Sequence, residues 1–373
     1  MRGSSPISDL APLLAMPLLA VALVACAGPG SNVHLDPLHV EAVTLDGGIE
    51  AVVLEPESLF REGGEAFERG EYQRAFAYYR LLVQRFPESP WAGPGQFNAG
   101  LSLERLQRWE EALPYFSSVV EGLTDPAEIH DTRLHVATCL EQLQRWDDLV
   151  ALWDLCLEAR GDALDPLEQI EVFARRGWAQ RGRGQLALAE RDFKAAFALQ
   201  RAHLSSPGMD RNAHITMARF QVGEIYRELF EDIRFQLPME QMKRDLEDKS
   251  NLFLKAQAAY LRAIRQSHPS WSPQAGFRLG ALYETLYEHM MAADVPAELP
   301  DEQVSEYFKV LRDRIRPLIE QAVDIFERNI HLTERLGGDD EWLRRSRASL
   351  ARLRQVLLEE LTRDTLEALH GAP

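Results

Sequence analysis

A ten-residue segment that recurs every 37 residues is the feature of this sequence that most constrains its fold. Its three copies begin at Ala66, Leu103 and Leu140, and each holds a turn followed by an aromatic residue. Each copy also lies between two helical patterns. Self-similarity at a period of roughly 20 to 50 residues is typical of repeat architectures, in which each unit covers the apolar face of its neighbour. The sequence therefore predicts an array of helix hairpins rather than one small core.

Small residues and one aromatic residue keep a fixed register within these units. A Gly or Ala on each helix lets the two backbones approach, and the aromatic ring fills the space beside them. The pattern resembles the tetratricopeptide repeat (TPR), a 34-residue helix-turn-helix unit with small residues at positions 8 and 20 and an aromatic residue at position 24. Four such repeats begin at Pro56, Gly93, His130 and Ile170. The residues at these three positions are Gly63, Ala75 and Tyr79, then Gly100, Ala112 and Phe116, then Ala137, Leu149 and Trp153, and finally Gly177, Ala189 and Phe193.

Two larger units follow the segment Ser205-Ser206-Pro207-Gly208, where the period is lost. Gly223 on one helix matches Ala256 and Tyr260 on a later helix, and Gly280 matches Ala322 and Phe326 in the same way. The segments that begin at Leu237 and Leu299 also echo each other, which indicates a duplication. We interpret residues 213–337 as two enlarged TPR-like hairpins whose second helices run for about thirty residues, the longer one kinked at Pro317.

A final helix is predicted over residues 338–373, where apolar residues recur at three- and four-residue spacing from Trp342 to Leu361. The resemblance then implies an all-α fold, a TPR-type helix-turn-helix solenoid wound as a right-handed superhelix with extended C-terminal hairpins and a capping helix. Its expected parts are a signal peptide at 1–25, a tether at 26–55, four repeats at 56–204, two enlarged hairpins at 213–337 and the cap at 338–373.

The N-terminal segment is an apolar run from Leu10 to Ala25 after a basic residue, too short and too rich in proline to span a bilayer. The run closes with Leu23, Val24, Ala25 and Cys26, which resembles the lipobox of bacterial lipoproteins. This resemblance implies cleavage before Cys26 and a diacylglycerol on its thiol, and Ala27 after the cysteine implies sorting to the outer membrane. An uncleaved anchor with an incidental cysteine is the alternative.

Residues 26–55 lack a helical pattern and are expected to form a tether. The apolar stretches 40–45 and 49–54 flank Asp46-Gly47-Gly48, which favours a β-hairpin that docks on the first helices.

Two further cysteines, Cys139 and Cys156, invite a disulfide in an oxidising compartment. The repeat register places them about 13 Å apart along a helix pair, beyond the roughly 7 Å that a disulfide allows between Cα atoms. We predict two free, mostly buried thiols.

Charge and motifs exclude several functions. With 41 basic and 58 acidic residues the net charge is −17, which disfavours binding to nucleic acid. The sequence holds no nucleophile elbow, phosphate-binding loop or His-Glu-x-x-His helix. We therefore expect no catalytic residues, no metal site, no cofactor and no enzymatic activity.

A candidate partner-binding groove follows from the resemblance, because the first helices of TPR units line a concave face with positions 2, 5, 9 and 12. Aromatic residues at position 5 would form an apolar stripe for an extended or helical peptide, and charged residues near position 12 would form a selective rim. Cover of this stripe by the next repeat is the alternative. The groove residues are Phe60, Phe67, Phe97, Leu134, Trp178, Phe220, Phe277, Arg105, Arg181 and Arg227.

The resemblance implies a lipid-anchored scaffold that binds other proteins in the bacterial cell envelope, at the outer membrane and facing the periplasm. Its partners would be envelope proteins, and the membrane through the lipid. Assembly of an outer-membrane, pilus, secretion or motility machine is the expected role. Two alternatives stay open, a surface lipoprotein that binds glycans for nutrient uptake and an activator of a cell-wall enzyme.

Overall fold

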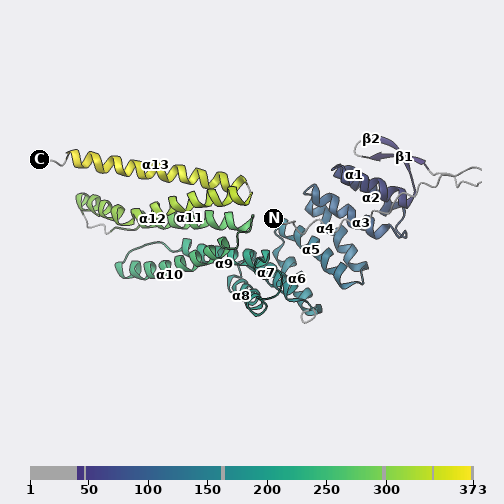
Figure 1. Ribbon diagram of the computed structural model, residues 1–373, viewed down its shortest axis with the longest axis horizontal. Coiled ribbons are helices and arrows are strands. Elements are labelled where there is room, and N and C mark those ends of the chain that lie inside the picture. The colour runs from purple at the N-terminus through teal and green to yellow at the C-terminus, as the bar shows by residue number, and fades with distance from the viewer. Residues whose placement is uncertain (1–39, 46–47, 161–163, 296–299, 338–339, 371–373) are drawn as a thin grey trace, which may run out of the picture.

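The computed structural model describes residues 40–45, 48–160, 164–295, 300–337 and 340–370. The signal peptide, the lipobox residues and Cys26 lie outside these ranges. The described residues form thirteen helices: twelve make six antiparallel pairs, one after another along an elongated array, and the last helix follows the sixth pair (Figure 1). The fold is all-α and of the TPR solenoid type, which confirms the predicted fold class.

Eight helices make the four units of ordinary size. Each helix contacts the next one along the chain, so the pairs stack without a central core. The helices are α1 (Pro56–Glu68) and α2 (Tyr72–Arg85), α3 (Ala92–Arg105) and α4 (Trp109–Gly122), α5 (Pro126–Gln142) and α6 (Trp146–Arg160), and α7 (Pro166–Gly182) and α8 (Leu186–Ala202).

The C-terminal half consists of longer helices that lie side by side and extend away from the smaller units (Figure 1). The second helices of the two enlarged hairpins contain 26 and 36 residues, and the longer one continues through Pro317. The longer helix ends at Gly337, whose backbone is in the left-handed conformation. The helices are α9 (Ala213–Asp232), α10 (Met239–Ile264), α11 (Trp271–Met291), α12 (Asp301–Leu336) and α13 (Asp340–His370).

Side-chain caps set where several first helices begin. Asp125 accepts hydrogen bonds from the backbone N–H groups of Ala127 and Glu128 at the start of α5. Asp165 and Glu168 form a reciprocal capping box at the start of α7. Because the first turn of each helix is fixed in this way, the register of its inward-facing residues is fixed as well.

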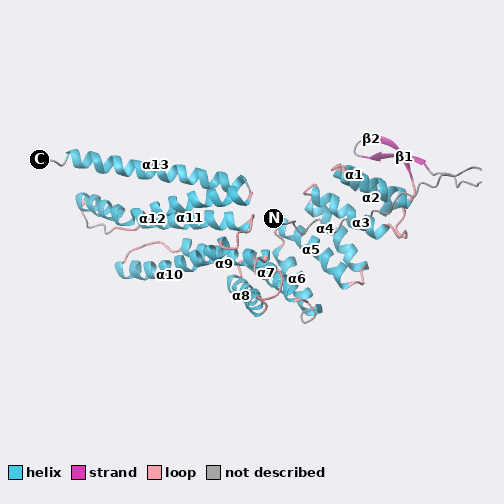
Figure 2. Ribbon diagram, in the orientation of Figure 1, coloured by secondary structure: helices cyan, strands magenta, loops and turns pink. Residues whose placement is uncertain are grey.

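A β-hairpin covers the open side of the first unit (Figure 2). Strands β1 (Val40–Leu45) and β2 (Gly48–Val53) pair antiparallel, with Val40 opposite Val53. Val52 and Leu54 are buried against α1 and α2. The first unit has no preceding helix pair in the described chain, so this hairpin takes over the burial of its apolar face.

Both remaining cysteines are free and buried, as the register predicted. Cys139 lies on α5 and Cys156 on α6, within the same apolar cluster. Burial raises the pKa of the Cys139 thiol to about 12, so this group is an inert core residue at neutral pH.

Candidate functional site: the first-helix face and the Phe97 groove

A glycine on five of the six first helices lies against an aromatic ring of the partner helix, and this contact fixes the repeat register; α5 has Ala137 at the same position. A Cβ atom at Gly100 would lie 2.8 Å from the ring of Phe116, and one at Gly177 would lie 2.7 Å from the ring of Phe193. The enlarged units share the feature, since a Cβ atom at Gly280 would lie 2.7 Å from Phe326. Because these units share one register, each predicted groove residue can be placed in its unit by its repeat position.

The phenylalanines at position 5 pack between neighbouring units. Phe97 lies 5.5 Å from Phe116 of its own unit and 5.3 Å from His135 of the next, measured between ring centroids. Phe277 is placed in the same way between Phe326 and Trp342. The rings at this position join adjacent units instead of lining an open stripe.

The prediction that Phe220 lines the groove is wrong, because its side chain is only 5% exposed and belongs to the core of the enlarged units. Phe60, Phe67, Phe97, Leu134, Trp178 and Phe277 are half-buried. Phe60 lies 4.8 Å from Trp91, and Trp178 lies between Trp146 and Trp271. Side chains from neighbouring elements thus cover much of the apolar surface that the sequence offered for binding.

Polar side chains on the first helices form a ladder from unit to unit. The residue at position 12 of one unit contacts the residue at position 6 of the next. Glu104 Oε2 lies 2.8 Å from His135 Nδ1, and Arg175 Nη1 donates to Glu141 Oε1 at 2.9 Å. Arg181 Nη1 donates to Gln221 Oε1 at 2.8 Å and continues the series. This ladder was not predicted from the sequence, although polar residues recur at positions 6 and 12 of successive repeats and could have indicated it.

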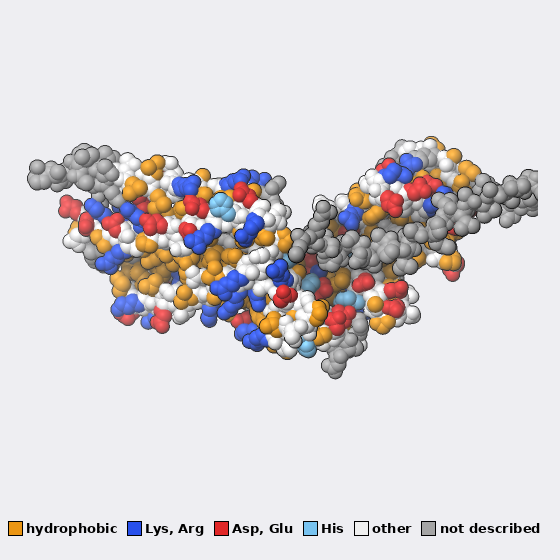
Figure 3. All heavy atoms as spheres, viewed as in Figure 1, with side chains coloured by type: hydrophobic (Ala, Val, Ile, Leu, Met, Phe, Trp, Pro, Cys, Tyr) orange, Lys and Arg blue, Asp and Glu red, His pale blue; other side chains and the backbone are white. Residues whose placement is uncertain are grey.

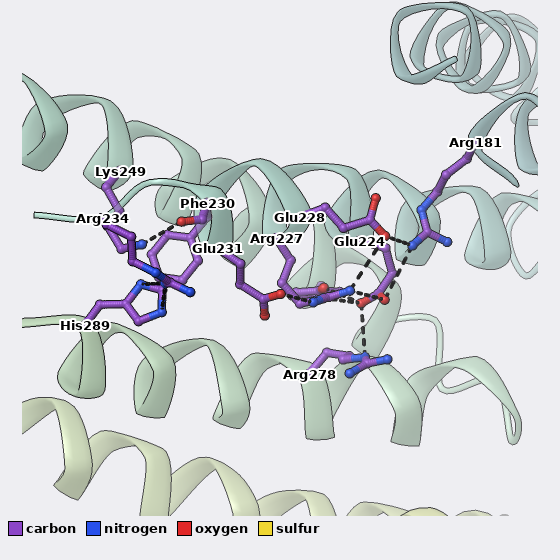
Figure 4. Close-up of polar contacts among 11 residues, drawn as sticks. Arg181, Glu224, Arg227, Glu228, Phe230, Glu231, Arg234, Lys249, Arg278 and His289 are labelled. Atoms are coloured by element: carbon purple, nitrogen blue, oxygen red, sulfur yellow. Dashed lines mark hydrogen bonds and ion pairs between the residues drawn. The ribbon is translucent and has the colours of Figure 1, made fainter. Parts of the chain in front are cut away.

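The ladder continues at α9, which carries a cluster of carboxylates. The predicted rim residues Arg181, on α7, and Arg227, on α9, both pair with Glu224 there (Figure 4). Arg227 Nη1 lies 2.6 Å from Glu231 Oε2, and Arg181 contacts Glu228. Burial opposes ionisation of Glu224, but the guanidinium groups of Arg278 and Arg227 outweigh this effect and hold its pKa below the usual value. The two arginines are therefore engaged within the protein, which corrects their expected role as an open rim. Arg105 is exposed and has no ion-pair partner in the described part of the chain.

Lys249 forms a second polar cluster at the end of α9 (Figure 4). Its side chain is fully buried, and Nζ donates to the carbonyl oxygens of Phe230 at 2.6 Å and Ile233 at 2.9 Å. These carbonyl groups lie at the C-terminal end of the helix, where a cation satisfies them and complements the helix dipole. The buried lysine is thus explained by helix capping.

Phe97 lines a groove of about 490 Å³. We call it the Phe97 groove. A Cβ atom at Gly93 or at Gly122 would meet no other atom within 4 Å, so the groove is open at these two residues. The lining comes from α3 (Gly93, Pro94, Gln96 and Phe97), from the end of α4 (Ser118, Val119, Gly122 and Leu123) and from the start of α5 (Glu128, Asp131 and Thr132).

The chemistry of the Phe97 groove is apolar with an acidic edge. Phe97 and Val119 supply the apolar surface, and Glu128 and Asp131 place two carboxylates beside it. Thr132 is buried and donates its hydroxyl to the Glu128 carbonyl at 2.8 Å, so it adds no free donor. Such a surface suits a peptide segment with an apolar side chain close to a cationic one.

Neither a metal site nor a membrane span is found within the described ranges. No group of three His, Cys, Asp or Glu side chains there is arranged to hold a metal ion. None of the described helices combines the length and the apolar character needed to cross a membrane.

Residues 57–89 match the family model of the tetratricopeptide repeat, and they cover α2 and all of α1 except Pro56. No curated protein matches the sequence. The match agrees with the TPR-type solenoid fold that the helices and the repeated glycine–aromatic contact define, and this fold suggests a scaffold for protein–protein interaction.

The solved structures that match this chain are distant from it in sequence. A tetratricopeptide repeat protein from Parabacteroides merdae is 16% identical, with 78% of this chain and 98% of that one covered and a TM-score of 0.38. YrrB, described as a TPR protein with an unusual peptide-binding site, is 16% identical over 55% of this chain and 86% of that one, with a TM-score of 0.36. A Rap protein complexed with competence and sporulation factor is 15% identical over 83% and 77%, with a TM-score of 0.36.

Proposed function

We propose that this protein is a lipid-anchored TPR scaffold without enzymatic activity that binds segments of partner proteins in the bacterial cell envelope. The Phe97 groove is the observation that carries the binding role, because it offers open apolar surface beside two carboxylates. The rest of the first-helix face is largely occupied by contacts between units, as the ladder from Glu104 to Arg181 illustrates. Partner binding is therefore assigned to this groove.

The anchor and the location rest on the sequence. Leu23, Val24, Ala25 and Cys26 close a short apolar segment, and a cysteine in that setting is the acceptor of a diacylglycerol. Two or three acyl chains on one residue give stable anchoring, at about 0.8 kcal/mol for each buried methylene group. We place the protein at the outer membrane, facing the periplasm, where it would assist assembly of an outer-membrane, pilus, secretion or motility machine.

Crosslinking in living cells tests the binding role. The native lipoprotein is compared with Ser118→Tyr, which fills the Phe97 groove from an exposed position on α4, and with Ser305→Tyr, which places the same ring at an exposed position on α12. We expect the native protein and Ser305→Tyr to capture the same set of envelope proteins and Ser118→Tyr to lose it. Equal capture by all three proteins would move the binding site elsewhere, and capture of no protein would contradict the scaffold role.

A further inference from the structure

A second groove lies between the second helices α8 and α10, with α9 at its floor. It consists of two hollows of about 380 and 370 Å³ that share Phe197, Val222, Ala259 and Arg262, so they form one continuous depression. We call it the basic groove. It lies outside the first-helix ladder and has no part in the binding site proposed above.

The charge of the basic groove is opposite to that of the whole chain. Its lining holds five cations and one carboxylate, Glu190, in a protein whose net charge is −17. Figure 3 shows Lys and Arg side chains gathered where α8, α9 and α10 meet. The cations are Lys194, Arg201, Arg219, Lys255 and Arg262. Such a local excess creates an attractive potential for anionic groups.

The three arginines of the groove have no carboxylate partner among the described residues, unlike the arginines of the ladder. Arg219 Nη2 donates to the amide oxygen of Gln200 at 3.1 Å, and Arg201 and Arg262 are exposed. Burial, and then repulsion from Arg262, lowers the pKa of the Arg219 guanidinium. Three unneutralised guanidinium groups around one hollow are a suitable receptor for carboxylates, because each presents several N–H donors in a planar fork.

Apolar surface lies directly beside these cations. Phe197 and Val222 line both hollows, and Leu254 is 57% exposed at the α10 side. A flat anionic membrane would reach the cations at the rim and Leu254 but would leave the half-buried Phe197 and Val222 in water. A peptide that carries both acidic and apolar side chains would cover both parts.

We propose that the basic groove binds an acidic segment of a partner protein, with carboxylates on Arg201, Arg219 and Arg262 and an apolar side chain against Phe197 and Leu254. The proposal rests on the scaffold function above and adds a second site of opposite charge. The Phe97 groove would take a cationic segment and the basic groove an acidic one, so a partner is selected by the order of its charges.

Binding of a labelled peptide to the full-length lipoprotein in neutral detergent micelles tests the proposal. The probe is a ten-residue peptide of Asp, Glu and Leu, and the comparison peptide replaces its acids with Lys. We expect saturable binding of the acidic peptide that weakens as salt rises, whereas the basic peptide, which suits the Phe97 groove, should bind the native protein and Arg201→Gln/Arg262→Gln equally. In Arg201→Gln/Arg262→Gln the dissociation constant should rise at least tenfold. Both arginines are exposed and unpaired, so the variant should keep its melting temperature.

A matched control removes the same charge elsewhere. Arg314→Gln/Arg344→Gln changes two exposed arginines on α12 and α13 and should bind the acidic peptide as the native protein does. Equal binding to the native protein and to the Arg201/Arg262 variant would overturn the proposal. Binding of vesicles with anionic lipid through the same two arginines, without binding of the peptide, would overturn it in favour of a membrane surface. Either result would leave the crosslinking outcome for Ser118→Tyr unaffected, so failure of this inference is distinguishable from failure of the scaffold role.

Discussion

Gly223 on α9 lies directly against the ring of Tyr260 on α10, and a Cβ atom at Gly223 would clash with Cε1 of that ring. The ring cannot move away freely, because the Tyr260 hydroxyl donates to Glu224 at 2.6 Å within the buried polar network. The contact joins the two helices of the first enlarged unit in the same way as in the ordinary repeats.

Gly223→Ala should therefore lower the free energy of unfolding by about 1 to 3 kcal/mol, because the added methyl overpacks the helix contact. Urea denaturation measures this change. Gly93→Ala is the control, since its Cβ would meet no atom within 4 Å in helix α3. The control should be neutral or slightly stabilising, and an equal loss in both variants would mean that the helix contact is not tight.

Asp192→Ala should destabilise the fourth repeat strongly. Asp192 is 1% exposed and accepts two hydrogen bonds from Arg176, at 2.7 and 2.8 Å. Removal of one partner from a buried ion pair costs about 3 to 5 kcal/mol, and Asp154 on the other side of Arg176 should keep the loss near the lower value.

The control for this ion pair is Asp148→Ala, whose pair with Arg145 is about half exposed and is expected to contribute about 0 to 1 kcal/mol. Thermal unfolding followed by circular dichroism separates the two variants. Melting temperatures that fall equally would show that the buried pair contributes no more than a surface one.

Acid should weaken the fold through His289. Burial, with added repulsion from Lys249 and Arg234, lowers the pKa of the His289 imidazole from 6.5 to about 4. The unfolded chain thus takes up this proton first as pH falls, so the stability that depends on the neutral imidazole is present above pH 6.5 and lost between about 6.5 and 4.

His289→Gln should flatten the decrease in melting temperature over this pH range, because glutamine can still accept a hydrogen bond from Arg234 but does not titrate. His331→Gln is the control, as that side chain is 82% exposed. The control should keep the native pH dependence. A native pH profile in His289→Gln would assign the acid sensitivity to other groups.

Cys26→Ala should release the protein from membranes, because the thiol that would carry the lipid is removed. Two-phase detergent partitioning of cell extracts measures the effect, with Cys139→Ala as a control that keeps Cys26. We expect the native protein and the control in the detergent phase and Cys26→Ala in the aqueous phase. Unchanged partitioning of Cys26→Ala would refute the lipid anchor.

Helix pairing was predictable in detail because its determinants are local. Gly100 and Phe116 belong to one hairpin, and their sequence spacing alone indicates the contact that the structure contains. The same reasoning located Cys139 and Cys156 as free thiols. The interpretation of Phe220 as a groove residue was wrong, because helices α10 and α11 bury a ring whose repeat position suggested exposure.

The candidate sites were less predictable, because their residues come from several helices. The Phe97 groove depends on the end of α4 and the start of α5 as well as on Phe97. The three arginines of the basic groove come from α8, α9 and α10, and nothing in their spacing indicates that they share a hollow.

The repeat, the register of small and aromatic residues, and hence the array of helix pairs can be predicted from the sequence, because they depend on residues within one hairpin. Which side chains remain available to bind a partner depends instead on how neighbouring units pack. Arg181 and Gln221 are 40 residues apart in the chain and bond across two units, whereas Arg262 meets no carboxylate among the described residues. Burial and ion pairing of a side chain depend on the neighbouring unit. The repeat pattern indicates which positions of that unit lie nearby, but it does not specify the charge of the residues at those positions.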